Sequence, residues 1–272
     1  MDTFIQQIIN GLVLGSIYAL VALGYTMVYG ILGLINFAHG EVVMIGALTA
    51  LTVIKLLADS GLPGTVVVLI GLLAAIPVCM ALGFTIERIA YRPLRNAPRL
   101  APLITAIGVS IVLQQLAMIF WGRNYHAFPP ILPTSSREIG GAHITDVQIV
   151  IILLAVAIMA GLMLLVNRTR LGRAMRATAE NPQIAGLMGV NINVIISATF
   201  LIGSALAAVA GVMVSANYSI AHYHMGFILG LKAFTAAVLG GIGNLPGAML
   251  GGVLLGLIES LGAGYIGGLT GG

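Results

Sequence analysis

The chain has 272 residues, of which 59% are hydrophobic and 7% are charged, whereas a soluble globular protein carries about 25% charged residues. So few charges cannot supply the polar surface of a water-soluble enzyme or a nucleic-acid-binding protein, and we expect no nucleic-acid partner. The composition predicts a multi-pass protein surrounded by membrane lipids. We expect an all-α fold in a single transmembrane domain that covers residues 1–272.

Apolar stretches of about 20 residues predict the membrane-spanning helices. Five of them are uninterrupted, at 7–30, 65–86, 101–121, 147–166 and 192–214. Two further stretches, 31–54 and 227–266, contain breaks. We therefore expect seven or eight spans. The side of the N-terminus stays open, because it depends on whether the segment after residue 36 crosses the membrane fully.

Eight of the twelve basic residues form two clusters. They are Arg88, Arg92, Arg95, Arg99, Arg168, Arg170, Arg173 and Arg176. Because basic residues are enriched in cytoplasmic loops, the clusters predict such loops at about 87–100 and 167–191. The segment at about 122–146 contains Pro130 and Pro133, and one predicted span separates it from each basic cluster. It is therefore predicted to be an extracytoplasmic loop.

The breaks near 35–41 and 240–247 point to a translocation path. Irregular backbone at membrane depth is tolerated only inside protein or along a water-filled path, and paired interrupted segments are typical of repeat-built transporters. We therefore predict two structural repeats with interrupted helices. The candidate path residues are Asn36, His39, Gly40, Glu41, Lys232, Gly240, Gly241, Gly243, Asn244 and Pro246.

Three charged residues inside apolar stretches, Glu41, Lys232 and Glu259, have two interpretations. Charges at membrane depth commonly mark functional sites. Alternatively, Glu41 caps or anchors the helix that begins near Val42, and Lys232 pairs with Glu259.

Small-xxx-small glycine pairs favour tight packing within the chain over dimerisation. These pairs are Gly11/Gly15, Gly226/Gly230, Gly247/Gly251 and Gly252/Gly256.

The second basic loop has the pattern of a docking surface. Residues 172–180 are predicted to form a short amphipathic helix, which Pro182 ends or resets. Such a helix suits a groove on a cytoplasmic protein, and the alternative is contact with anionic lipid headgroups. The candidate docking residues are Gly172, Arg173, Arg176, Ala177, Glu180, Asn181, Pro182 and Gly186.

Enzyme motifs are missing from the sequence. It contains no H-E-x-x-H, G-x-S-x-G or C-x-x-C pattern, and neither lysine follows a phosphate-binding glycine loop. His222 and His224 lack a third donor cluster, so a polar loop is favoured over a metal site. We predict no enzymatic activity, no catalytic or metal site and no cofactor, and any ATP that drives transport must be bound by partner subunits.

Four blocks of sequence together resemble one known family. They are GYTMVYGI at 24–31, INFAHGE at 35–41, GRAMRA at 172–177 and KAFTAAVLGGIG at 232–243. In this order they resemble the LivH-type inner-membrane permeases of bacterial branched-chain amino acid ABC importers, over nearly the whole chain. Members of that family usually continue into another hydrophobic helix, so their span count is not imposed on this chain.

The resemblance implies a multi-pass protein of the bacterial inner (plasma) membrane. It also implies four kinds of partner: a second, LivM-type permease subunit, two cytoplasmic ATPase subunits that bind the ATP, and a periplasmic amino-acid-binding protein. The segment around Ala177, Glu180 and Gly186 would contact an ATPase subunit. The expected function is inward transport of leucine, isoleucine, valine or related amino acids.

Two alternative functions stay open from the sequence. A permease for urea or short amides would share the same permease family, and the cargo of the cognate binding protein distinguishes it. A stand-alone channel or ion-coupled carrier would use Glu41, Lys232 and Glu259 as ion or proton sites. Flux through the chain without any partner would favour this second alternative.

Overall fold

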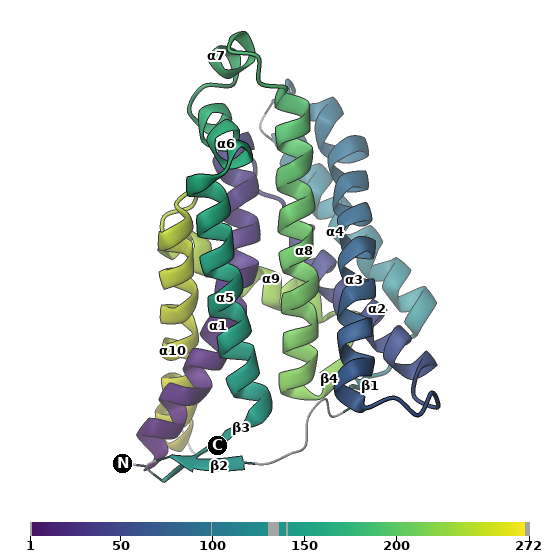
Figure 1. The fold of residues 1–272 in the computed structure, drawn as a ribbon, viewed down its shortest axis with the longest axis vertical. Coiled ribbons are helices and arrows are strands. Elements are labelled where there is room, and N and C mark those ends of the chain that lie inside the picture. Colours follow the sequence, from purple (N-terminus) through teal and green to yellow (C-terminus); the bar gives the residue numbers. More distant parts are fainter. Residues whose placement is uncertain (1, 99, 130–135, 140, 270–272) are drawn as a thin grey trace.

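The structure is a computed structural model that describes residues 2–98, 100–129, 136–139 and 141–269 (Figure 1). Its α-helices are α1 (Asp2–Leu32), α2 (His39–Leu56), α3 (Gly64–Ile86), α4 (Leu100–Trp121), α5 (Asp146–Arg168), α6 (Arg170–Glu180), α7 (Pro182–Leu187), α8 (Ile192–Tyr218), α9 (Met225–Leu239) and α10 (Leu245–Leu269). A π-helix, η1 (Glu87–Tyr91), and a 3-10 helix, η2 (Arg92–Leu94), prolong α3. The short strands are β1 (His126–Ala127), β2 (Ser136–Ile139), β3 (Ala142–Thr145) and β4 (Ile220–Ala221).

Among the described residues, seven helices are long and apolar enough to cross a membrane. They are α1, α2, α3 with its η1 and η2 extension, α4, α5, α8 and α10. Each uninterrupted span predicted from the sequence lies inside one observed helix, so the all-α polytopic fold is confirmed. The remaining apolar helix, α9, has 15 residues, and it is too short to count as a full span. The prediction of two structural repeats stays a prediction.

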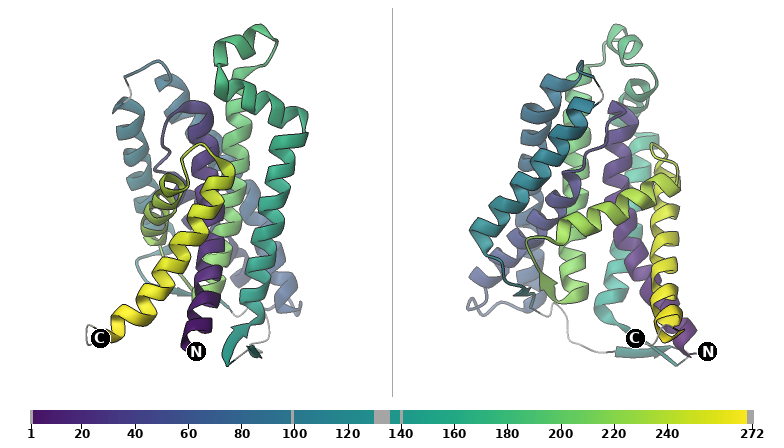
Figure 2. Two further views of the ribbon diagram at one scale, coloured as in Figure 1. Left: turned by 90° about the vertical axis from the view of Figure 1, so that its left-hand side faces the viewer. Right: turned by 180° about the vertical axis from the view of Figure 1, so that it is seen from behind.

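The long helices stand side by side along the long axis of the molecule, whereas α9 runs obliquely across them (Figure 2). The α6 and α7 segment caps one end, and the N-terminus lies at the opposite end with the β2–β3 hairpin (Figure 1). The positive-inside bias predicts that the basic α6 end faces the cytoplasm. If that end is cytoplasmic, the N-terminus and the loop after α4 are predicted to lie on the outer side.

Glycines bring α1 and α10 into close contact. A β-carbon on Gly256 would lie 2.2 Å from the backbone nitrogen of Gly15, and one on Gly252 would lie 2.4 Å from that of Ala19. The helix backbones approach each other this closely because these positions carry no side chain. The glycine pairs of α1 and α10 therefore pack within one chain, as predicted.

The first interruption returns the chain to the middle of the bundle. After α1 ends, Gly33 adopts a positive φ of 63°, and α2 begins at His39, whose ring lies beside Gly24. Gly24 precedes the end of α1 by eight residues, a rise of about 12 Å. His39, Gly40 and Glu41 belong to the first turn of α2; placing them in the break itself was wrong, and the break covers residues 33–38.

The second interruption is a tight turn between α9 and α10. Gly241 and Gly243 have positive φ values of 85° and 96°, a conformation that favours glycine. The Asn244 side chain accepts a hydrogen bond from the backbone nitrogen of Gly247 at 3.3 Å. Pro246 and Gly247 were predicted to lie in the break but belong to the first turn of α10, where proline is tolerated because its nitrogen needs no helical partner.

The structure adds detail to two of the predicted loops. Residues Glu87–Leu94, in the predicted cytoplasmic loop at about 87–100, are helical; Arg99 lies outside the described residues. The segment 122–146 contains strands that were not predicted: β1 pairs with β4, and β2 pairs with β3. Pro130 and Pro133 lie outside the described residues.

Candidate functional site

The predicted path residues around the start of α2 form one buried cluster. Oδ1 of Asn36, a residue only 4% exposed, accepts a hydrogen bond from the Tyr91 hydroxyl at 3.1 Å. The His39 ring packs edge-on against the Tyr25 ring, with 5.0 Å between the centroids. A β-carbon on Gly24 would lie 2.1 Å from Nε2 of His39, so α1 admits this ring only because residue 24 is glycine.

Gly40 lets α2 and α9 meet at the same level. A β-carbon on Gly40 would lie 2.4 Å from the carbonyl oxygen of Gly226 and 2.9 Å from the Cα of Gly230. Since both neighbours are backbone atoms, no side-chain rotation could relieve the clash. The predicted Gly226/Gly230 pair therefore serves contact within the chain, and it sets the beginning of α9 against the beginning of α2.

Glu41 is fully buried and carries an incompletely satisfied carboxylate. Its Oε1 accepts hydrogen bonds from the Ser110 hydroxyl at 3.0 Å and the Gln114 amide at 2.7 Å. Its Oε2 has no hydrogen-bond partner within the described part of the chain. Of the two structural roles predicted for Glu41, capping is wrong, since α2 has no side-chain cap. The carboxylate does anchor the beginning of α2, and its partners on α4 were not indicated by the sequence.

A cavity of about 440 Å³ lies beside this cluster, between α4 and α9. It is lined by Tyr25, Phe37, Ile107, Ser110, Ile111, Gln114, His224, Phe227 and Leu231. Both donors to Glu41 are therefore wall residues. Most of the remaining wall is aliphatic or aromatic, so the cavity combines one polar side with a predominantly apolar lining, as small-molecule sites commonly do.

Lys232 forms the ion pair that the sequence offered as an alternative to a substrate contact. Its Nζ donates to Oε1 of Glu259 on α10, and Oε2 of the same carboxylate accepts a hydrogen bond from the Tyr18 hydroxyl at 2.9 Å. Three helices, α1, α9 and α10, meet in this group. The predicted pairing is confirmed, and both charges are used in contacts between helices.

The second group of candidate path residues lies elsewhere. A β-carbon on Gly243 would lie 3.8 Å from the Cα of Gly30, which is six residues, or about 9 Å, further along α1 than Gly24. Within the described residues, no hydrogen bond or ring contact joins Gly240, Gly241, Gly243 or Asn244 to the cluster at α2. The two interrupted segments thus contact α1 at different heights.

Sequence reasoning missed a buried acidic residue directly after the C-terminal end of α3. Glu87 is fully buried, and its carboxylate accepts from Arg92 at 3.2 Å, from Arg95, and from the Ser197 hydroxyl at 2.8 Å. Arg95 also donates to the side chain of Asn193 at 2.6 Å. The group joins the end of α3 to the beginning of α8. A glutamate followed by three arginines within eight residues, two of which contact it, was the available signal.

The predicted docking helix is present as α6, and it is tied to the end of α5. Thr169 caps its N-terminus by accepting from the Gly172 nitrogen at 3.0 Å. A β-carbon on Gly172 would lie 2.2 Å from the carbonyl oxygen of Val166, and the Arg176 guanidinium donates to that same carbonyl. The face with Met175 is buried, which agrees with the predicted amphipathic character of the helix.

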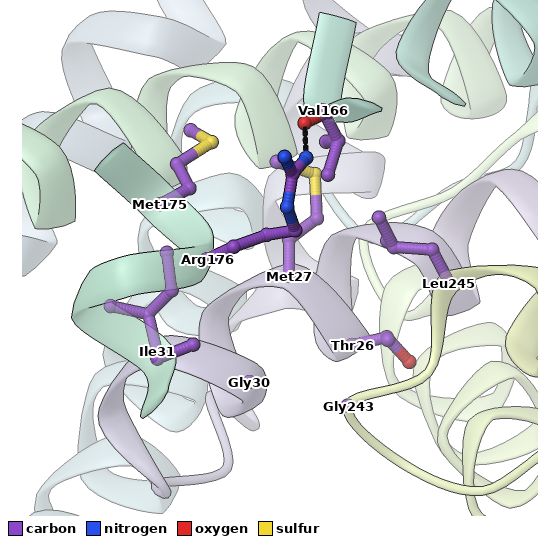
Figure 3. Close-up of a pocket in the computed structure, with 10 residues that line it drawn as sticks. Thr26, Met27, Gly30, Ile31, Val166, Met175, Arg176, Gly243 and Leu245 are labelled. Atoms are coloured by element: carbon purple, nitrogen blue, oxygen red, sulfur yellow. Dashed lines mark hydrogen bonds between the residues drawn. The ribbon is translucent and has the colours of Figure 1, made fainter. Parts of the chain in front are cut away.

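A cavity of about 100 Å³ separates α6 from α1 and the α9–α10 turn (Figure 3). Met175 and Arg176 line it from α6, Met27 lines it from α1, and Gly243 and Leu245 line it from the second interruption. The close-up shows the Arg176 side chain reaching across this space to Val166. The candidate docking helix therefore neighbours one of the two interrupted segments.

The tip of the α6–α7 segment exposes apolar side chains that the sequence reasoning did not single out. Asn181 caps α7 by accepting from the Ile184 nitrogen at 3.0 Å, and Pro182 occupies the first turn. Ile184, Leu187 and Met188 are 58%, 87% and 81% exposed. They lie beyond the ends of the long helices, where α7 protrudes (Figure 1). Glu180 and Gly186 are exposed beside them.

Comparison with known proteins assigns the chain to a family. A family model described as "Branched-chain amino acid transport system / permease component" matches residues 7–269. The chain belongs to this family. The match covers nearly the whole sequence, so the resemblance found in four separate blocks is confirmed.

Two relatives show how close the similarity is. The chain is 51% identical to the high-affinity branched-chain amino acid transport system permease protein BraD of Pseudomonas aeruginosa, over 97% of this chain and 88% of BraD. It is 47% identical to the permease protein LivH of the corresponding system of Escherichia coli K12, over 97% of this chain and 87% of LivH. No solved structure matches the chain.

Proposed function

We propose that the chain is the permease subunit of an ATP-binding cassette importer that carries branched-chain amino acids inward across the bacterial inner membrane. The observation that carries this proposal is the 51% identity with BraD over 97% of the chain, since BraD is named for high-affinity branched-chain amino acid transport. Seven helices able to cross a membrane support a multi-pass position.

The proposed assembly contains a second permease subunit, two cytoplasmic ATPase subunits and a periplasmic amino-acid-binding protein. The exposed Ile184, Leu187 and Met188 support an ATPase contact, because large apolar side chains outside the bilayer commonly mark protein interfaces. The ATP is bound and hydrolysed by the partners. This chain supplies the translocation path and the surface on which the movement of the ATPase subunits acts.

Transport proceeds by alternating access around the interrupted helices. Closure of the ATPase subunits moves α6 and α7, and α6 borders both α1 and the α9–α10 turn. Because α1 also packs against His39 at the start of α2, a displacement of α6 reaches both interruptions. The proposed path residues are those of the α2 cluster, with Asn36, His39, Gly40 and Glu41 around the middle of the bundle.

A substrate panel tests the proposal against its close alternative. The assembled transporter in proteoliposomes, with its binding protein outside, is expected to accumulate leucine, isoleucine and valine when ATP is supplied inside. Urea and acetamide serve as competitors. Strong inhibition by urea together with weak inhibition by isoleucine would instead support an amide or urea permease.

A further inference from the structure

In the part of the chain that the structure describes, the buried carboxylate of Glu41 has hydrogen-bond partners on one oxygen only. Its side chain is fully buried and Oε2 has no hydrogen-bond partner among the described residues. Burying a charged group with an unsatisfied oxygen costs more free energy than burying an apolar side chain of the same size. Charged residues at membrane depth are accordingly retained for contacts with substrates or ions.

The two donors to Glu41 still have acceptor atoms to offer. An ionised carboxylate only accepts hydrogen bonds, so the Ser110 hydroxyl and the Gln114 amide nitrogen both donate to Oε1. The lone pairs of Ser110 Oγ and the Gln114 Oε1 oxygen remain, and both residues line the cavity of about 440 Å³. One wall of this cavity therefore presents two acceptors backed by a negative charge.

The start of α9 stabilises that negative charge. A β-carbon on Gly226, in the first turn of α9, would lie 2.8 Å from Oε2 of Glu41. The N-terminal end of a helix carries a partial positive charge, which favours a neighbouring carboxylate. This contact favours the carboxylate form of Glu41 and does not occupy the acceptors on the cavity side.

We infer that the cavity between α4 and α9 binds the amino-acid substrate by its ammonium group, with Ser110 and Gln114 as acceptors and Glu41 as the opposite charge. The inference rests on the proposed function, because only that function supplies a substrate with an ammonium group and an aliphatic side chain. Ile107, Ile111 and Leu231 line the rest of the cavity, and they offer an apolar surface to a branched side chain.

The first test measures whether the charge of Glu41 reaches the cavity. Cys79 is the sole cysteine of the chain and is buried, so a Cys79→Ala background allows labelling of a Ser110→Cys variant in the assembled transporter. A cationic methanethiosulfonate is expected to react about tenfold faster than an anionic one. Adding Glu41→Gln is expected to remove this preference. Equal rates for the two reagents, a preference that survives Glu41→Gln, or an unreactive Ser110→Cys variant would overturn the inference.

The second test asks which part of the substrate is recognised. In the same background, leucine is expected to protect an Ile111→Cys variant, whose residue lines the cavity without being an acceptor, from labelling. 4-Methylpentanoate, which has the same side chain without the ammonium group, is not expected to protect it. Equal protection by the two compounds, or none by leucine, contradicts an ammonium site. Because Glu41→Gln can fail to assemble, Gln114→Ala serves as a second variant that is expected to require about tenfold more leucine for protection. Its matched control, Gln115→Ala, changes an exposed neighbour on α4 and is expected to behave as the parent.

Uptake in the same vesicles separates the two proposals. If the parent assembly accumulates leucine with ATP but the labelling results are negative, the ammonium site is wrong and the proposed function stands. If the parent assembly accumulates no leucine, the proposed function itself fails.

Discussion

Glu87 shows how a charge is kept inside this protein at the residue scale. The carboxylate is fully buried, yet two guanidinium groups and one hydroxyl donate to it. The main effect of such a buried acid on stability appears when one member of the group is removed, because the remaining charges are then buried without a partner. Glu41 differs, since one of its oxygens is left without a partner among the described residues. The first carboxylate therefore fits a structural role and the second fits a role in binding.

The contrast predicts that Glu87→Gln destabilises the protein. The variant leaves Arg92 and Arg95 without their counter-charge. Removing one member of a fully buried pair costs about 3–5 kcal/mol, and since the two arginine side chains are 28% and 17% exposed, we expect about 2–3 kcal/mol. Thermal unfolding in detergent measures it. The control is Glu138→Gln, which changes an exposed carboxylate on β2; equal losses in the two variants would exclude a specific role for Glu87.

At the element scale, the contact of α1 with α10 depends on glycine. A methyl group at Gly256 would meet the backbone of Gly15, so Gly256→Ala is expected to destabilise the protein by about 1–3 kcal/mol, as overpacking does. The matched control is Gly161→Ala on α5, where a β-carbon meets no atom within 4 Å. There the better helix propensity of alanine is expected to stabilise by up to about 1 kcal/mol. Thermal unfolding that ranks the two variants in the opposite order would contradict the packing.

The exposed tip of α7 predicts a second effect at this scale. Leu187 is 87% exposed, so Leu187→Asp is expected to leave the fold of the chain intact while weakening its binding to the ATPase subunits. Burial of one leucine contributes about 1.5–3 kcal/mol, which corresponds to at least a tenfold loss of affinity. Co-purification of tagged permease with the ATPase subunits measures this loss of affinity.

A leucine at the other end of the molecule provides the control. Leu62 is 45% exposed in the turn before α3, and Leu62→Asp is expected to retain the ATPase subunits. If Leu187→Asp co-purifies with them as well as the parent does, α7 is not the docking surface.

The sequence predicted those elements whose pattern is local. Uninterrupted apolar stretches predicted α1, α3, α4, α5 and α8, because length and hydropathy alone specify a span. The contact of Glu41 with Ser110 and Gln114 joins residues about 70 positions apart, and no periodicity indicates such a pair. Glu87 was assigned to a loop because a charge at the end of an apolar stretch resembles a membrane boundary. Leu187 was overlooked because a single apolar residue close to a span carries no signal of exposure.

At the scale of the whole molecule, the fold predicts an orientation in the membrane. The α6–α7 end carries the second basic cluster and lies opposite the β2–β3 hairpin. In the Cys79→Ala background, Gln183→Cys on α7 is expected to react with an impermeant thiol reagent only from the cytoplasmic side, and Ser136→Cys on β2 only from the outer side. Both residues are exposed. Labelling of both variants from one side would contradict the orientation.

The central claim is that this chain moves amino acids only as part of an ATP-driven assembly. Accumulation of radiolabelled leucine in proteoliposomes, with ATP inside and the binding protein outside, tests it most directly. The complete assembly is expected to accumulate leucine against its gradient and to stop when ATP is replaced by a non-hydrolysable analogue. Leucine accumulation or ion flux by the chain alone, or uptake by the assembly that continues without ATP hydrolysis, would contradict the account.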